Sequence, residues 1–145
     1  MSYLLDTCII SEFAARQPSV SVLHWLVGQM EERMHLSAIT IGELKYGVER
    51  LPLTERRARL EQWLEIDVLA RFQSRILPVD TLVMLRWGAL KAHLERIGRP
   101  MQPMDSLIAA TALAHNLILV TRNTGDFGDA GVQLFNPWQE TADTQ

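Results

Sequence analysis

The segment Tyr3-Leu4-Leu5-Asp6-Thr7 decides the fold class, because an apolar run of strand character ends at an acidic residue and leads into a short helical pattern over 9–13. The same order returns later, where the expected strand 35–39 is followed by a helix over 40–50 that contains Glu43. A strand followed at once by a helix is the repeating unit of α/β proteins with parallel sheets. The sequence therefore predicts a fold of this class.

The rest of the chain continues the alternation. Helical spacing of apolar residues predicts further helices over 19–33, 53–72, 80–97 and 105–115. Short apolar runs predict further strands at 76–79, 117–121 and 132–135. Pro103 is expected in the first turn of its helix. We expect a three-layer α/β sandwich with a mostly parallel central sheet and helices on both faces, formed as a single domain over 1–139 with a polar tail over 140–145.

Length and composition limit the class of protein further. The 145 residues are 48% apolar and 21% charged, with a formal net charge of -3, which suffices for a core without disulfides or structural zinc. The apolar runs are too short for a membrane span, and the first residues lack the basic segment of a secretory signal. We therefore expect a cytoplasmic domain with no membrane association. The acidic balance excludes a surface that wraps nucleic acid all round, although local binding stays possible.

Four acidic residues follow or open the predicted elements: Asp6, Glu43, Asp105 and Asp126. Taken singly, each has a structural explanation as a helix cap, a capping-box glutamate behind Thr40, a first-turn acid or a turn residue. A parallel sheet, however, would bring all four toward one rim. Carboxylates about 4 Å apart repel by about 4 kcal/mol, so such a cluster favours a bound cation. Oxygen ligands without His or Cys predict Mg²⁺ or Mn²⁺.

The segments around these acids resemble the four acidic blocks of the PIN-domain ribonucleases, and are most similar to the VapC and FitB type toxins of bacterial toxin-antitoxin pairs. The blocks are Leu4–Thr7, Ser37–Leu44, Met104–Ala112 and Val120–Phe127, together with the ending Val132–Trp138. The resemblance covers nearly the whole chain. It implies an Mg²⁺-dependent endoribonuclease, with Mn²⁺ able to substitute, that cleaves RNA such as tRNA or rRNA.

The resemblance also implies residue roles. Asp6 and Asp105 would be the main metal ligands, and Glu43 and Asp126 would complete the site or hold metal-bound water. Polar support would come from Thr7, Thr121 and Asn123. Some relatives carry an acid at the position of Asn123, which leaves open which residue of the last block contacts the metal directly. The basic residues nearest to these acids in sequence are expected to contact substrate phosphates, and they are Lys45 and Arg122.

The partners that the resemblance implies are a second copy of the chain and a cognate antitoxin. The antitoxin would wrap the toxin and block the acidic pocket, with much of the contact on the helices spanning Thr40 to Phe72. A homodimer would place two acidic pockets in one groove.

Other functions stay open on the residues alone. The acids could be caps in a non-catalytic module that binds a partner through amphipathic helices. A receiver-like phosphotransfer domain would also gather acids at the rim of such a sheet, but it expects a Lys after a late strand and this chain has no Lys beyond Lys91. A zinc site is not expected, because Cys8 and the histidines lack ligand spacing. We expect Cys8 to be a small apolar filler.

Overall fold

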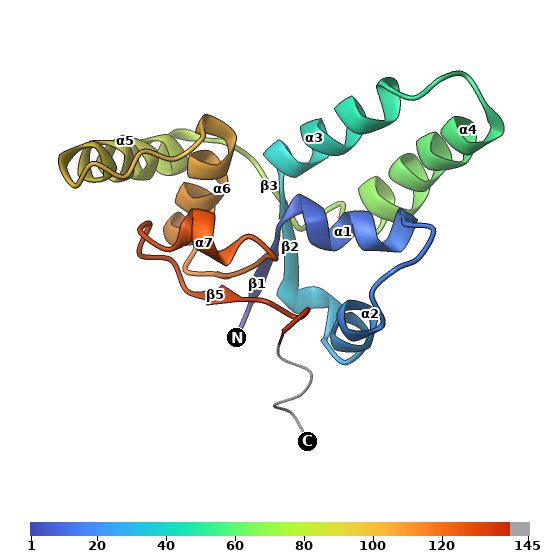
Figure 1. Cartoon of the computed structure of the whole chain (residues 1–145), viewed down its shortest axis with the longest axis horizontal. Helices are drawn as coiled ribbons and strands as arrows, with labels where there is room; N and C mark the ends of the chain where they lie inside the picture. The colour runs from blue at the N-terminus through green and yellow to red at the C-terminus, as the bar shows by residue number, and fades with distance from the viewer. Residues whose placement is uncertain (140–145) are drawn as a thin grey trace.

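The sheet is the element that positions everything else. The computed structural model describes residues 1–139 and has five parallel strands in the order β3-β2-β1-β4-β5 (Figure 1). The strands are β1 (Tyr3–Leu5), β2 (Met34–Ser37), β3 (Ile76–Leu77), β4 (Ile118–Val120) and β5 (Leu134–Phe135). The polar tail expected over 140–145 lies outside the described residues. The prediction of a parallel α/β sheet is confirmed.

The central strand β1 shows why both faces of the sheet are apolar. Leu4 and Leu5 are neighbours in sequence, and successive side chains of a strand point to opposite faces. Accordingly, Leu5 lies in a core cluster with Ile9 and Val22, whereas Leu4 lies in a separate cluster with Ile108. A strand that is buried on both sides must be apolar throughout, as this one is.

Helices cover both faces, which confirms the three-layer sandwich (Figure 1). One face carries α1 (Thr7–Ala14), α2 (Val20–Val27), the 3₁₀ turn η1 (Glu31–Arg33), α3 (Ala38–Glu49), α4 (Glu55–Gln62) and the π-helical continuation η2 (Trp63–Ala70). The other face carries α5 (Thr81–Arg96), α6 (Pro103–Ala114) and the short α7 (Thr124–Phe127). Among the helices of residues 1–139, none has both the length and the apolar character needed to cross a membrane.

Two of the predicted helices differ in extent. The helix expected over 19–33 ends at Val27, because Gly28 caps it and the chain then forms the η1 turn before β2. The helix expected over 53–72 begins only at Glu55, behind the capping side chain of Thr54, and its second half is π-helical. Gly28 marks the end of one helix and Thr54 the start of the other. The prediction from apolar spacing alone did not take these two local signals into account.

The predicted capping box of Thr40 with Glu43 is wrong. The helix α3 begins at Ala38, and the residue that caps it is Ser37, whose hydroxyl accepts the backbone N–H of Ile39 at 3.0 Å. Both residues of the expected box therefore lie inside the helix, where Glu43 has no capping role. Its carboxylate is available for contacts beyond its own helix.

Candidate active site

The side chain of Asp6 is fixed where β1 ends and α1 begins. Its backbone N–H donates to Val120 O at 3.0 Å, which extends the β1–β4 pairing by one residue. Oδ1 accepts the backbone N–H of Thr7 at 2.8 Å and so caps α1, while Oδ2 accepts the hydroxyl of Thr121 at 2.8 Å. Only 5% of Asp6 is exposed. Capping and membership of an acidic site are therefore compatible in this residue.

Thr121 is held in turn by the strands beside it. Its backbone N–H donates to Phe135 O at 2.9 Å, and its hydroxyl oxygen accepts the backbone N–H of Asn123 at 3.0 Å. Asn123 thus supports Asp6 indirectly and through its main chain, because its side chain is exposed. Of these two expected support residues, Thr121 is the one in contact with an acid.

Glu43 reaches the same region from α3. The hydroxyl of Thr7 donates to Glu43 Oε1, and the hydroxyl oxygens of Thr7 and Thr40 lie 3.2 Å apart. Thr40 is fully buried, so it provides a fixed polar floor between α1 and α3. This residue was not expected to belong to the site. The available signal was its place three residues before Glu43, which puts both side chains on one face of the helix.

Asp105 stands in the first turn of α6, and Asp126 lies in α7 rather than in the expected turn. Burial raises the pKa of Asp105, and the negative charges of Asp6, Asp126 and Glu43 raise it further. Like charges act this way only at short range. The charges of Asp6, Glu43 and Asp126 thus act on Asp105 from three other parts of the chain, namely the end of β1, α3 and α7.

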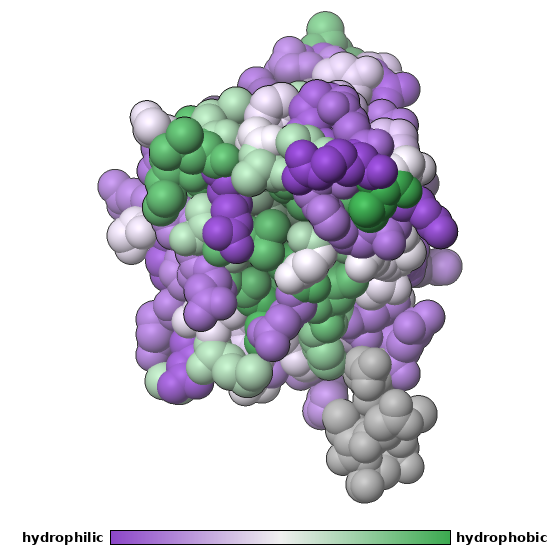
Figure 2. Space-filling model, turned by 90° about the vertical axis from the view of Figure 1, so that its left-hand side faces the viewer, coloured by the Kyte–Doolittle hydropathy of each residue, from purple (hydrophilic) through white to green (hydrophobic). Residues whose placement is uncertain are grey.

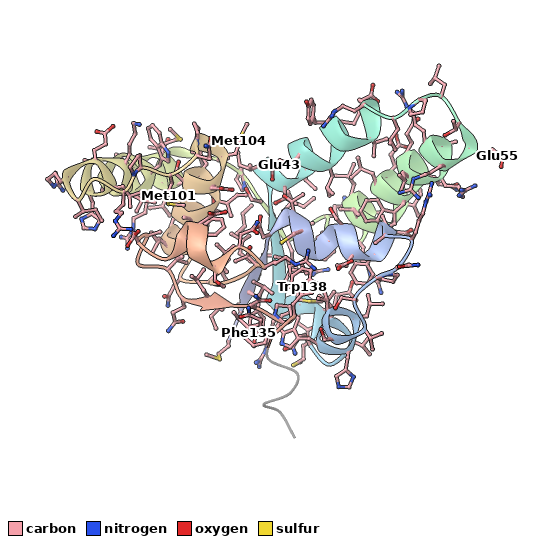
Figure 3. All side chains as sticks on the ribbon, in the orientation of Figure 1. Glu43, Glu55, Met101, Met104, Phe135 and Trp138 are labelled. Atoms are coloured by element: carbon pink, nitrogen blue, oxygen red, sulfur yellow. The ribbon has the colours of Figure 1, made fainter. Side chains whose placement is uncertain are left out.

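Figure 3 shows Glu43 on α3 and Met104 at the start of α6 near each other above the strands, where these two helices come into contact. Burial also raises the pKa of Asp6, although the hydrogen bonds from Thr121, Thr7 and Cys8 oppose the rise. Two of the acids thus hold their protons more tightly than free carboxyls do. A nearby cation would reverse this effect by favouring the charged forms.

Cys8 is more than the apolar filler that was expected. It is half-buried, and its Sγ lies 3.9 Å from Asp6 Oδ2 and 3.8 Å from Thr121 Oγ1. Burial and the charge of Asp6 raise the pKa of the thiol. Residues two apart on a helix do not normally face each other, so the position of Cys8 after Asp6 gave no signal of this contact.

The start of α6 is anchored by a contact that sequence reasoning did not anticipate. The indole N–H of Trp87 on α5 donates to Ser106 Oγ at 2.9 Å, and the Ser106 hydroxyl donates to Pro103 O at 2.7 Å. Ser106 directly follows Asp105 and is 5% exposed. The turn that carries Asp105 is therefore tied to the neighbouring helix.

The two basic residues expected near substrate are placed differently. Lys45 Nζ pairs with Glu49 Oε2 at 3.0 Å, which directs its side chain along α3. The guanidinium of Arg122 lies 4.2 Å from the ring centre of Trp138. Arg122 directly follows Thr121, the residue that contacts Asp6.

The donor set decides which metal the residues fit. As the side chains stand, residues 1–139 contain no group of three or more His, Cys, Asp or Glu placed to hold a metal ion. The atoms that face the centre are carboxylate and hydroxyl oxygens, and the raised pKa of the Cys8 thiol keeps it protonated. Hard divalent cations prefer such oxygen ligands, whereas zinc sites are rich in thiolate and imidazole. The donor atoms present are thus of the kind that a hard cation prefers.

The pattern of the protein family described as "PIN domain" matches residues 3–132, which include all four acids. This chain belongs to the PIN-domain family. Nucleases of this family generally depend on a divalent metal.

This PIN domain has relatives of almost the same length. It is 38% identical over 136 residues to "VapC ribonuclease Y4jK" of Sinorhizobium fredii, covering 94% of this chain and 97% of that protein. It is 39% identical over 137 residues to "Toxin FitB" of Neisseria gonorrhoeae, covering 94% and 99%. It is 31% identical over 140 residues to "tRNA(fMet)-specific endonuclease VapC" of Shigella flexneri, covering 95% and 98%.

Solved structures agree with this membership. The crystal structure of FitAcB from Neisseria gonorrhoeae superposes on this PIN domain with a TM-score of 0.90 at 39% identity, covering 94% of this chain and 99% of that one. A toxin-antitoxin complex from Klebsiella pneumoniae superposes with a TM-score of 0.69 at 28% identity, covering 94% and 98%.

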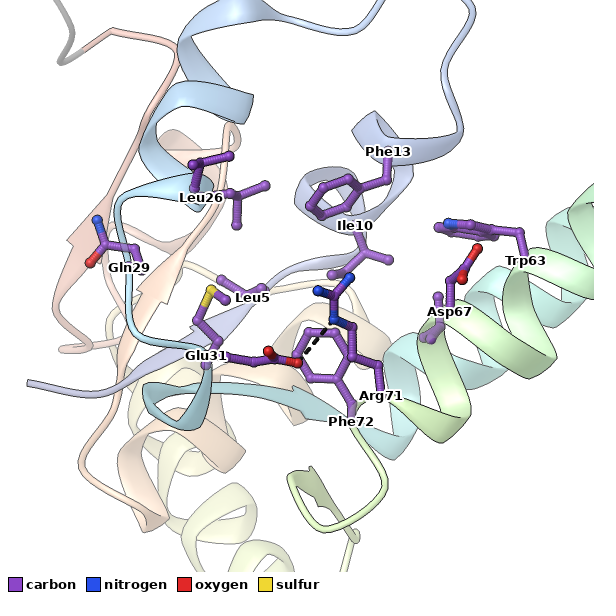
Figure 4. A pocket seen from close by; sticks show the side chains of 13 residues that line it. Leu5, Ile10, Phe13, Leu26, Gln29, Glu31, Trp63, Asp67, Arg71 and Phe72 are labelled. Carbon is purple, nitrogen blue, oxygen red and sulfur yellow. Dashed lines mark hydrogen bonds and ion pairs between the residues drawn. The ribbon is translucent and has the colours of Figure 1, made fainter.

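An apolar groove is the second surface feature of this PIN domain (Figure 4). Its volume is about 670 Å³, and it lies between α1, α2 and η2. Its lining includes Leu5, Ile10, Phe13, Leu26, Trp63 and Phe72. At one end, Arg71 Nε pairs with Glu31 Oε1 at 3.0 Å. The groove therefore combines an apolar floor with charged groups at its edge.

Proposed function

We propose that this chain, as a single nuclease domain over 1–139, is an Mg²⁺-dependent endoribonuclease and the toxin of a toxin-antitoxin pair. The observation that carries the proposal is the charge crowding at Asp105, whose pKa is raised by burial and further by the charges of Asp6, Asp126 and Glu43. Independent helix caps would not converge from four elements. The relatives named as ribonuclease, endonuclease and toxin support the same reading.

In the proposed site, Asp6 and Asp105 are the main ligands of the ion, and Glu43 and Asp126 complete the site or hold a water against it. Bound Mg²⁺ would polarise a backbone phosphate and lower the pKa of a water, and Mn²⁺ would substitute for it. The chain's own contribution is orientation. Thr121 and the Thr7 backbone fix both oxygens of Asp6, and the Thr7 hydroxyl fixes Glu43.

Two further residues would act on the attacking water and on the negative charge of the RNA. A carboxylate within hydrogen-bond reach of the attacking water can orient it and accept its proton, and the exposed Asp126 is free to do so. RNA approaches a chain of net charge -3, so a basic side chain must offset the repulsion between phosphate and acids. Arg122, next to the Thr121–Asp6 contact, is better placed for this than Lys45, which pairs with Glu49.

The test is cleavage of a total tRNA and rRNA pool by the purified, antitoxin-free chain, with Mg²⁺ and with EDTA. We expect Mg²⁺-dependent cutting, its loss in Asp105→Asn, and its retention in Asp129→Asn, which removes an exposed charge three residues after Asp126. Cutting that persists in EDTA or in Asp105→Asn would contradict the proposal. Absence of both cutting and Mg²⁺ binding would leave the acids as caps of a non-catalytic binding module.

We further propose that the apolar groove binds the cognate antitoxin. The groove exposes aromatic and aliphatic side chains, with Phe13 50% and Val27 83% exposed. Its η2 wall falls within the helices expected to carry this contact, while α1 and α2 add a wall that was not expected. Val27→Asp should weaken inhibition by the antitoxin and leave cleavage by the free toxin unchanged. If the antitoxin inhibits the wild-type chain and Val27→Asp equally, it binds outside this groove.

The homodimer is likewise a proposal, and α5 with α6 is its best candidate surface. Leu82 and Leu85 on α5 are 54% and 70% exposed, and Met104 on α6 is 53% exposed. Figure 2 views the molecule from this side and shows apolar patches among polar side chains. Leu85→Glu should convert a dimer to a monomer in sedimentation velocity, whereas an unchanged mass would exclude this surface.

A further inference from the structure

The segment that follows β5 turns back toward the acidic site. Asn136 is 5% exposed, and its Oδ1 accepts the backbone N–H of Trp138 at 2.9 Å. Its Nδ2 donates to the backbone oxygen of Arg122 at 3.5 Å. A buried side chain therefore joins the last described segment to the loop after β4, the loop whose Thr121 holds Asp6.

The guanidinium of Arg122 lies over the ring of Trp138. The distance from Arg122 Cζ to the ring centre is 4.2 Å. Figure 3 shows Trp138 below α1, near Phe135 at the end of β5. The ring also packs against the core cluster on the α1 side. The indole N–H of Trp138 is buried and finds no hydrogen-bond acceptor among residues 1–139. The stack with Arg122 and the packing against this cluster thus orient the ring.

Stacking on the ring of Trp138 affects how Arg122 can bind a phosphate. A guanidinium that lies on an aromatic face keeps the N–H groups along its edge free for a phosphate, and it loses less conformational freedom when it binds one. Arg122 is exposed and follows the residue that holds Asp6. Lys45, the other basic residue near the acids in sequence, is engaged by Glu49.

We propose that Trp138 is a positioning residue that holds Arg122 in place to bind a phosphate of the RNA backbone beside the acidic site. The segment Asn136–Trp138 is then part of the substrate-binding machinery rather than a cover for the core. The inference rests on the proposed nuclease function, because it names how that same site holds its substrate.

The experiment measures binding of a fluorescein-labelled single-stranded 20-nucleotide RNA by anisotropy over a series of NaCl concentrations, with Asp105→Asn as the non-cleaving background. Arg122→Gln should weaken binding about tenfold and lower the slope of log K against log salt concentration by about 0.7, the loss of one phosphate contact. Trp138→Leu should give most of the same loss. In steady-state cleavage by the otherwise intact enzyme, both changes should raise KM more than they lower kcat.

Non-additive effects of the Trp138 and Arg122 substitutions on RNA binding distinguish a positioning role of Trp138 from a packing role. Trp138→Leu should add little in the Arg122→Gln background, because the ring then has no guanidinium to position. Trp138→Phe keeps an aromatic face and should restore binding to within about threefold of the parent. Tyr46→Leu is the matched control. The ring of Tyr46 on α3 lies under the guanidinium of Arg50, whose Cζ is 5.3 Å from the ring centre, and the substitution removes this ring without changing charge. It should leave RNA binding unchanged.

The outcomes distinguish this inference from the function on which it rests. If the wild-type chain cleaves RNA but Arg122→Gln leaves binding and its salt slope unchanged, the phosphate contact is wrong. If Trp138→Leu weakens binding equally in both backgrounds, or Trp138→Phe fails to restore it in a variant that melts like the parent, the ring acts through packing alone. If the wild-type chain neither binds nor cleaves RNA, the proposed function and this inference fall together.

Discussion

At the scale of single residues, the site is a balance between burial and charge. Asp6 combines two roles that sequence reasoning treated as alternatives, since one oxygen caps α1 and the other accepts the Thr121 hydroxyl. Among residues 1–139, no hydrogen bond offsets the effect of burial on the pKa of Asp105, and three neighbouring acids raise that pKa further. The two residues thus differ in how the chain compensates a buried negative charge.

Asp105→Asn should stabilise the metal-free protein while it abolishes cleavage. The raised pKa means that charged Asp105 destabilises the folded state above that pKa, whereas below its ordinary value of 3.8 the residue is neutral in both states. At pH 7 in EDTA, we expect Tm to rise by about 2–4 °C for each kcal/mol of destabilisation that the substitution removes. This rise in Tm should become smaller as the pH falls toward 4. The measurement is a set of thermal melts from pH 4 to pH 8.

The control for this prediction is Asp80→Asn, which alters an acid that caps α5 outside the cluster. That variant should show no gain at any pH. A Tm of Asp105→Asn below that of the wild type in EDTA would instead mean that Asp105 serves chiefly the α6 dipole, an effect of about 0.3–1 kcal/mol.

At the scale of elements, helix starts decide which side chains reach the site. The capping-box prediction for Thr40 and Glu43 failed because the hydroxyl of Ser37 starts α3 earlier than the pattern indicated. Two or three residues of difference in a helix start rotate a side chain to another face. The prediction of Pro103 in the first turn of α6 is confirmed, since Pro fits only there in a helix.

The anchoring of α6 gives a testable prediction at this scale. Ser106→Ala leaves the Trp87 N–H without its acceptor, so the free energy of unfolding should fall by about 1–2 kcal/mol in urea denaturation. RNA cleavage should also fall, because Asp105 shares the loosened turn. Trp87→Phe removes only the donor of this hydrogen bond. The double variant should lose less free energy of unfolding than the sum of the losses in the two single variants.

Ser11→Ala, an exposed serine on α1, is the matched control for this change and should alter neither quantity. Strict additivity of Ser106→Ala and Trp87→Phe would show that their hydrogen bond contributes nothing to the stability of α6.

At the scale of the whole molecule, the site exists only because both halves of the sandwich are present. Asp6 and Glu43 belong to elements on one face of the sheet, and Asp105 and Asp126 to elements on the other. Figure 1 shows α3 and α6 starting on either side of the strands. A cation held by both groups would therefore link the two faces.

Mg²⁺ should accordingly raise the Tm of the wild-type chain. A ligand at a hundred times its dissociation constant stabilises by about 2.7 kcal/mol, or about 5–10 °C for a chain of this length. The measurement compares melts in MgCl₂ with melts in NaCl of equal ionic strength. Asp6→Asn and Asp105→Asn should lose the rise. The same rise in these variants would mean that Mg²⁺ binds away from the acids.

The sequence by itself determined the α/β class, the order of the elements and the identity of the four acids. Local periods, turn residues and capping hydroxyls carry that information within a few neighbouring residues. Only the tertiary structure decided that Thr40 lies beside Thr7, that Cys8 lies beside Thr121, and that Trp138 lies under Arg122. Such contacts depend on strand order and on the rotation of each helix about its axis, because residues distant in sequence meet only when sheet and helices pack together.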